Sequence, residues 1–150
     1  MTTKDSSIKR RVVATWGAAL ILAMAVSAQA QISVIAAKST EAKATKTEVK
    51  EIFTGVKLKW PNGNKIQVVD QPDTELGKKF YDMVIGKSAN QIRRQWMKLL
   101  LSGQAAAPIK QPSDKNVKKI VAGNPNAIGY IATSALDDSV REILRIDKEK

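Results

Sequence analysis

The chain has 150 residues, of which 25 are Lys or Arg and 14 are Asp or Glu, so its formal net charge is +11. It contains neither cysteine nor histidine. These absences exclude a disulfide, a Cys/His metal site, a thiol nucleophile and a catalytic histidine, and the sequence shows no other catalytic constellation. We therefore predict a non-enzymatic protein without metal or cofactor, and the basic charge favours an anionic partner.

The N-terminal segment has the pattern of a secretory signal peptide. Basic residues at 9–11 precede an uncharged, largely apolar stretch over 12–26, and an Ala-Gln-Ala sequence at 28–30 supplies the small residues of a cleavage site. The apolar stretch is shorter than the roughly 20 residues that span a bilayer, and an uncleaved membrane anchor is the alternative. We predict that residues 1–30 are cleaved and that a single periplasmic domain follows over residues 31–150.

The first part of this domain alternates strand and helix patterns. An apolar run over 32–37 predicts a buried strand. Thr45 and a glutamate three residues later have the form of a capping box, and Gly55 ends the helix that this cap would start. A Trp-Pro-Asn-Gly-Asn turn occupies 60–64, with positive φ expected at its glycine. The β-branched run over 66–69 predicts the second strand.

Two helices are predicted next. Either Asp73 or Thr74 can cap the first, which ends before Gly86. Ser88 and a glutamine three residues later form a second capping box, and the helix behind it shows apolar residues at the i, i+4, i+7 and i+8 spacing before Gly103 closes it. Both helices therefore present one apolar face to a core.

The last part of the domain contains one helix and two strands. Residues 104–112 are a predicted loop with two prolines, and Ser113 opens a short helix that ends in the Gly-Asn-Pro-Asn sequence at 123–126. Residues 128–131 predict a buried strand. The alternation of apolar and charged residues over 140–146 indicates an edge strand with one solvent-exposed face. The order β-α-β-α-α-α-β-β predicts an α/β domain with a small mixed sheet flanked by helices.

Three segments resemble the phosphate-binding proteins of ABC transporters, which have the type 2 periplasmic binding protein fold. Glu51-Ile52-Phe53-Thr54-Gly55, followed by Trp60, is similar to the end of a helix in that family and the turn after it. Residues 66–70 lead into a helix with Phe80, and residues 123–130 are close to the family's Asn-Pro-Gly-Ala-Ile-Gly-Tyr turn and strand. The resemblance covers nearly all of the predicted domain.

This resemblance implies a fold, a function and a site. The fold would be a single lobe of a type 2 periplasmic-binding-protein-like protein, whereas a full member of the family holds its ligand between two lobes. The function would be phosphate binding for an ABC transporter. Thr74 keeps a hydroxyl where the family has serine, and we take Thr74, Gln71 and Ser39 as the candidate ligand-binding residues, with Ser39 placed after the first strand.

The stretch after the second predicted strand departs from the family. Asp70 stands in the place of the phosphate-pairing arginine. Asp73 and Glu75 add negative charge at the start of the next helix, where they stabilise the helix themselves and would repel phosphate. We therefore expect a self-capped helix with weak or no phosphate affinity, and the resemblance implies that an arginine at position 70 would strengthen binding.

Two functional hypotheses thus remain open. One is a solute-binding protein for phosphate or another small anion; the other is a single-lobe periplasmic interaction or scaffold module that has lost phosphate binding. The second would have a membrane protein, a periplasmic protein or a second copy as its partner. Basic residues on three predicted helices, at 78–79, 93–98 and 115–119, are dispersed, and the aromatic residues lie in apolar runs. This pattern favours solvated faces over nucleic-acid binding.

Overall fold

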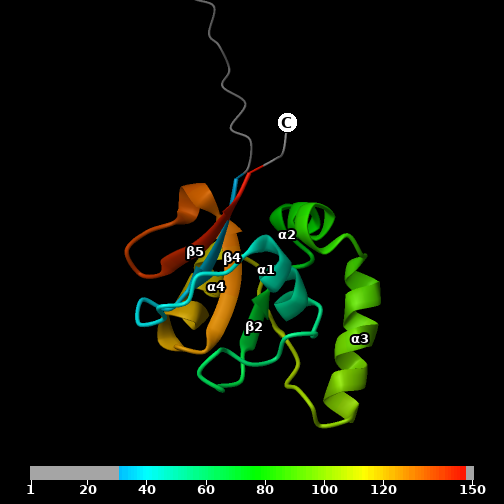
Figure 1. The fold of residues 1–150 in the computed structure, drawn as a ribbon. Coiled ribbons are helices and arrows are strands. Elements are labelled where there is room, and N and C mark those ends of the chain that lie inside the picture. Colours follow the sequence, from blue (N-terminus) through cyan, green and yellow to red (C-terminus); the bar gives the residue numbers. More distant parts are fainter. Residues whose placement is uncertain (1–30, 148–150) are drawn as a thin grey trace, which may run out of the picture.

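Five strands form one mixed sheet in the computed structural model, which describes residues 31–147 (Figure 1). The strands are β1 (Ile32–Ala36), β2 (Gln67–Asp70), β3 (Ile109–Lys110), β4 (Ala127–Ala132) and β5 (Arg141–Ile146). The helices are α1 (Lys46–Phe53), α2 (Glu75–Phe80), α3 (Ala89–Leu101) and α4 (Asp114–Gly123), with a π-helical turn over Tyr81–Ile85 and a 3-10 turn over Thr133–Ala135. The predicted α/β fold is confirmed.

The strand directions determine which loops meet. The order across the sheet is β3-β2-β4-β1-β5, in which β2 is parallel to both β3 and β4. β1 is antiparallel to both of its neighbours, β4 and β5. The carboxyl ends of β2, β3 and β4 therefore lie at one edge of the sheet, and the carboxyl end of β1 lies at the opposite edge. β5 is an outer strand, as its alternating sequence predicts.

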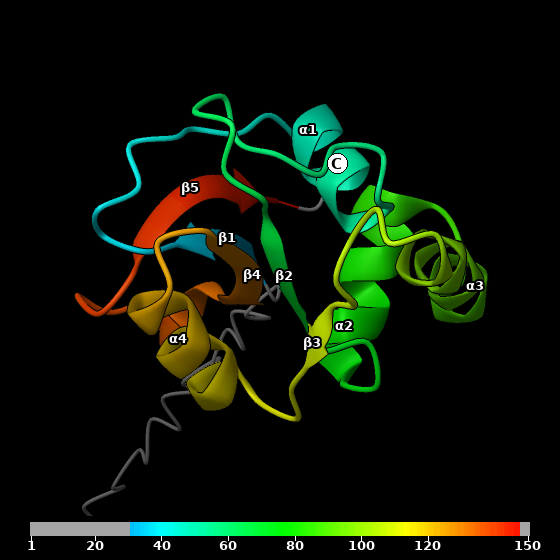
Figure 2. The ribbon, with the colours of Figure 1, turned by 90° about the horizontal axis from the view of Figure 1, so that it is seen from below.

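Helices cover both faces of the sheet (Figure 2). α4 packs on one face, where Val117 and Val121 join a cluster with residues of β1, β2 and β4. The approach is close because β4 has a glycine beneath the helix: a Cβ on Gly129 would lie 2.7 Å from a methyl group of Val117. The other three helices share the second, larger cluster on the opposite face. The result is a sheet with a separate apolar layer on each side.

Aromatic rings form the centre of the larger cluster. The rings of Phe80 and Tyr130 stack with their centroids 3.9 Å apart, and Phe53 meets Phe80 edge to face at 4.8 Å. The indole N–H of Trp96 on α3 donates a hydrogen bond to the Phe53 carbonyl at 2.9 Å. The aromatic residues, which the sequence places in apolar runs, are all buried within residues 31–147: Phe53, Trp60, Phe80, Tyr81, Trp96 and Tyr130.

Local signals place the helix ends correctly. Both capping boxes form, at Thr45 and at Ser88, and each cap accepts a hydrogen bond from the backbone N–H three residues later. Between the two residues that could cap α2, the structure selects Thr74. Gly63 in the Asn-Gly turn has φ +86°, as the turn requires.

Two features differ from the predicted elements. The segment 104–112, predicted as a loop, contains the two-residue strand β3, which pairs only with Val69 and Asp70 of β2. A strand of this length, between two prolines, carries no periodic pattern, so its pairing depends on the tertiary fold. In addition, the helix begun by α2 changes to π-helical geometry over Tyr81–Ile85 before Gly86 ends it.

The predicted signal peptide, residues 1–30, lies outside the described part of the chain. Within residues 31–147, no helix combines the length and the apolar character needed to cross a bilayer.

Candidate functional site

The loop from Gln71 to Thr74 joins the carboxyl end of β2 to α2. The Thr74 hydroxyl donates to the Gln71 carbonyl at 2.8 Å and accepts from the Gly77 N–H at 2.9 Å, so it fastens the loop to the first turn of the helix. Gly77 is required for this contact, because a Cβ there would lie 2.0 Å from the Gln71 carbonyl oxygen. The loop is thus held tightly by its own helix.

Gln71 is buried and connects three elements. Its side-chain amide donates to the Tyr130 carbonyl on β4 at 2.8 Å and to the Asp114 carboxylate at the start of α4 at 2.7 Å. The second oxygen of that carboxylate accepts the Ala132 N–H at 3.1 Å. The amide hydrogens of Gln71 are therefore used within the protein, and the residue fixes the edge of the sheet.

Asp70 is buried beneath this loop in a set of hydrogen-bond donors. Its carboxylate accepts the hydroxyls of Tyr81 at 2.6 Å and Tyr130 at 2.7 Å, and the N–H of Gln71 at 2.8 Å. Burial raises the pKa of the Asp70 carboxyl, and the two tyrosine hydrogen bonds oppose that rise. Burial, together with the nearby Asp70 charge, also raises the pKa of both tyrosines.

This arrangement corrects the expected role of the acidic residues. Asp70 does not cap α2; its carboxylate is buried and accepts hydrogen bonds from the two tyrosines. Glu75 is exposed and pairs with Lys78 at 2.6 Å, which lowers the pKa of Glu75. Of the three acidic residues, Asp73 alone has no ion-pair or hydrogen-bond partner for its side chain within residues 31–147. The expectation of a self-capped helix is confirmed by the Thr74 contacts.

Asp70 gives the protein a characteristic dependence of stability on pH. A carboxyl whose folded-state pKa is raised above its ordinary value, 3.8, contributes stability below that value and loses it as pH rises through the folded-state pKa. The wild-type protein should therefore exceed Asp70→Asn in free energy of unfolding most at about pH 4, with the difference shrinking as the pH rises further. Urea unfolding of both proteins at a series of pH values measures the difference, and a gap that widens with pH would contradict the assignment.

A pocket lies where the parallel strands β2 and β3 end side by side. Asp70 is paired in register with Lys110, so the exposed Lys110 comes next to the loop before α2. We call this opening the strand-end pocket; it is lined by Asp73, Thr74, Lys110, Gln111 and Pro112. Lys110 forms no ion pair in the described part of the chain, although its charge lowers the pKa of the buried Asp70, and its exposed side chain can reach a ligand.

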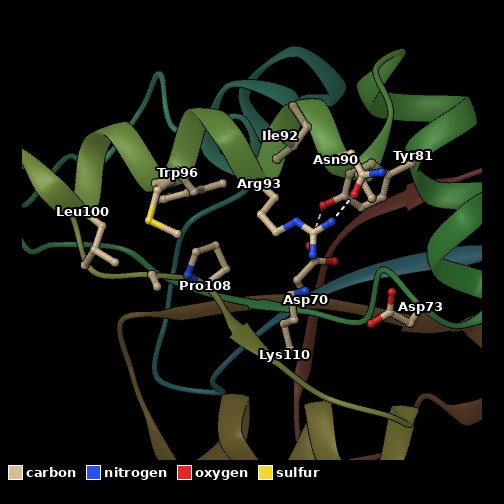
Figure 3. A pocket seen from close by; sticks show the side chains of 13 residues that line it. Asp70, Asp73, Tyr81, Asn90, Ile92, Arg93, Trp96, Leu100, Pro108 and Lys110 are labelled. Atoms are coloured by element: carbon tan, nitrogen blue, oxygen red, sulfur yellow. Dashed lines mark hydrogen bonds between the residues drawn. The ribbon is translucent and has the colours of Figure 1, made fainter.

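A second hollow adjoins the first and runs along α3. We call it the α3 cavity; its volume is about 150 Å³ and it shares Asp73 and Lys110 with the strand-end pocket. Figure 3 shows Arg93 reaching from α3 into this cavity toward Asp70, with its guanidinium bonded to Asn90. Farther along α3 the wall is apolar, formed by Trp96, Met97, Leu100, Ala107 and Pro108. The cavity thus has one charged end and one apolar end.

The three residues predicted to bind ligand do not all lie together. Gln71 and Thr74 are neighbours in the same loop. Ser39 follows β1, which runs antiparallel to β4, and it lines a different pocket with Trp60 and Asn62 at the opposite edge of the sheet. The sequence reading named neither Lys110 nor Arg93 as a ligand-binding residue, because only the strand pairing and the position of α3 bring them beside the loop.

Comparison with known proteins yields relatives of one kind. No protein-family model matches the chain. Over 111 residues the chain is 34% identical to the phosphate-binding protein PstS of Bacillus subtilis, a match that covers 71% of this chain and 32% of that protein. The chain therefore spans about a third of the length of this curated relative.

Solved structures agree with this similarity. A Clostridium perfringens structure, described as a phosphate ABC transporter substrate-binding protein with bound phosphate, matches with a TM-score of 0.61 and 28% identity, over 76% of this chain and 45% of that one. An ABC-type phosphate transport receptor from Vibrio cholerae has the same fold, with a TM-score of 0.60 and 19% identity over 77% and 46% of the two chains. The described residues thus form a phosphate-binding-protein-like domain with the α/β fold of one lobe of such proteins.

Proposed function

We propose that this chain is a non-enzymatic solute-binding protein of an ABC transporter and that its domain binds a small anion, with phosphate as the first candidate. The similarity to PstS and to a structure that holds phosphate supports this assignment. The signal-peptide pattern of residues 1–30 supports export to the periplasm.

The strand-end pocket is the observation that carries the proposal. In α/β proteins, ligands bind outside the carboxyl ends of parallel strands, which is where β2 and β3 place this pocket. Lys110 supplies a positive charge without an ion-pair partner in residues 31–147, and the Thr74 hydroxyl lies in the wall. We assign the contact with the anion to Lys110 and Thr74, and we assign to Gln71 the fixing of the loop.

We expect the affinity of this site for phosphate to be weak. Asp73 lies in the same wall as Lys110 and repels an anion. The amide of Gln71 and the hydroxyl of Thr74 already donate to groups of the protein, so an anion must compete with existing hydrogen bonds. These features predict a dissociation constant of about 1 mM or weaker.

Calorimetric titration of the purified protein with phosphate tests this site. Lys110→Gln should weaken binding by about threefold, the range for an exposed charge, whereas Lys79→Gln, which removes an equal charge from the exposed side of α2, should leave it nearly unchanged. Thr74→Ser should bind like the wild type because it keeps the hydroxyl. Micromolar binding would contradict the expected weakness, and no heat at about 20 mM phosphate would contradict anion binding itself.

A periplasmic interaction module is the second candidate. Val56 and Leu101 are large apolar side chains that are 68% and 80% exposed. Contiguous apolar patches mark docking surfaces, and these two side chains would contribute to one that binds a membrane protein, a periplasmic protein or a second copy. The absence of anion binding in the titration would favour this module over the solute-binding function.

A further inference from the structure

We propose that the α3 cavity receives an apolar substituent of the bound solute, so that the preferred ligand is an organic anion, a phosphonate or a phosphate monoester with a small apolar group. This inference rests on the proposed function, because it takes the anionic head to lie beside Lys110. It concerns the chemical class of the solute. Inorganic phosphate would supply the anionic head of such a solute but not its apolar substituent.

The first support is the connection between the two hollows. Asp73 and Lys110 line both the strand-end pocket and the α3 cavity, so the two spaces meet at these side chains. An anion placed against Lys110 therefore stands at the charged end of the α3 cavity. A substituent on that anion can extend along α3, where the apolar wall begins.

The second support is the apolar wall itself. Trp96 and Leu100 are four residues apart on α3, and Met97 lies between them, so all three project toward one side of the helix. Met97 is 48% and Leu100 43% exposed, although both are large apolar side chains. Ala107 and Pro108 form the opposite wall. Burial of these surfaces against an apolar group is favourable, because it removes them from water.

The volume of the cavity suits a single ring. The α3 cavity measures about 150 Å³, and an apolar cavity of about this size in another protein is known to bind benzene. A methyl to phenyl substituent therefore fits without a rearrangement of α3.

The charge at the inner end favours an anionic head over a cationic one. The Asp70 carboxylate already accepts three hydrogen bonds from within the protein. Among the exposed charged side chains that line the cavity, two are cations, Arg93 and Lys110, and one is a carboxylate, Asp73, whereas Asp70 is buried. The exposed cations favour an anion at this end, and Arg93 reaches into the cavity from the α3 side (Figure 3).

Calorimetric titrations of the purified protein with three probes test the inference. Phenylphosphonate carries the anion and the ring, inorganic phosphate carries only the anion, and benzylamine carries the ring with a positive charge. We expect phenylphosphonate to bind about tenfold tighter than phosphate, a gain that corresponds to partial burial of the ring, and benzylamine to show no binding. Equal binding of the two anions, or tighter binding of benzylamine than of phenylphosphonate, would overturn the inference.

Two substitutions in α3 test whether the phenyl ring of phenylphosphonate binds in the α3 cavity. Leu100→Ala should remove most of the tenfold preference while leaving phosphate binding unchanged. Leu101→Ala is the matched control, because Leu101 is the next residue, is 80% exposed and does not line the cavity. Both positions are exposed, so both variants should fold, which their thermal transitions would verify. An unchanged preference in Leu100→Ala would overturn the inference even where phosphate binds, whereas failure of both anions to bind would reject the proposed function as well.

Discussion

Replacement of Asp70 by alanine should lower the free energy of unfolding by about 3 kcal/mol. The substitution leaves the hydroxyls of Tyr81 and Tyr130 without their acceptor, and the N–H of Gln71 keeps only its longer contact, 3.3 Å, with the Tyr130 hydroxyl oxygen. Each buried donor left unpaired costs about 1–3 kcal/mol, from which the relief of burying a carboxylate is subtracted. Urea unfolding near neutral pH measures the loss.

The neighbouring Asp73 provides the control for this prediction. Its side chain is exposed and has no partner in residues 31–147, so Asp73→Ala should change the free energy of unfolding by less than about 0.5 kcal/mol. A loss below about 1 kcal/mol in Asp70→Ala would show that water replaces the carboxylate, and would contradict the role assigned to the cluster.

The same cluster corrects the expectation for an arginine at position 70. The resemblance implied that this change would restore the charge of the family and strengthen phosphate binding. In the structure, however, position 70 is buried and faces three donors. A guanidinium has no acceptor to offer them, so the substitution leaves the donors unpaired and adds a buried charge. The positive charge of this domain must act instead from Lys110 and Arg93.

Replacement of Gly77 by alanine should lower the free energy of unfolding by about 2–3 kcal/mol. The added methyl group would lie 2.0 Å from the Gln71 carbonyl oxygen and 2.9 Å from the Cα of Pro72, and both atoms belong to the backbone of the loop. The loop must therefore move away from α2, which displaces Thr74 from the strand-end pocket. We expect a measurable loss of phosphate binding along with the loss of stability.

Gly123 gives the matched comparison. It is the last residue of α4, and a Cβ there would meet no atom within 4 Å. Because alanine is the better helix former, Gly123→Ala should leave the stability unchanged or raise it by up to about 1 kcal/mol. Similar effects of the two substitutions, measured by the same unfolding experiment, would argue against a close approach at Gly77.

The elements that the sequence could predict are those whose signals are local. The capping boxes at Thr45 and Ser88, the Asn-Gly turn at Gly63 and the apolar run of β1 each depend on residues a few positions apart. Their physical causes, hydrogen bonds to free N–H groups and burial of one face, are the same in any tertiary context.

The candidate site depends on contacts between distant residues and was therefore harder to predict. Asp70 and Tyr130 are separated by 60 residues, and their hydrogen bond exists only because β2 and β4 are neighbours in the sheet. Read along the chain, Asp70 belongs with the acidic residues before α2; in the fold it belongs to the core. The location of Lys110 was equally hard to predict. Lys110 lies beside the loop because β3 pairs with β2, and β3 is too short to show a sequence pattern.

The short strand β3 also governs how firmly the cavity is closed. It forms two residue pairs with β2 and is the outermost strand on its side of the sheet within residues 31–147. Segments with so few contacts open at a free energy far below that of global unfolding. Ala107 has one further tie to β2, the hydrogen bond from the Gln67 side-chain amide to its carbonyl at 3.3 Å. We expect this segment to open before the aromatic core unfolds, which faster amide hydrogen exchange at Ile109 and Lys110 than in β4 would show. Such opening would widen the cavity for larger solutes.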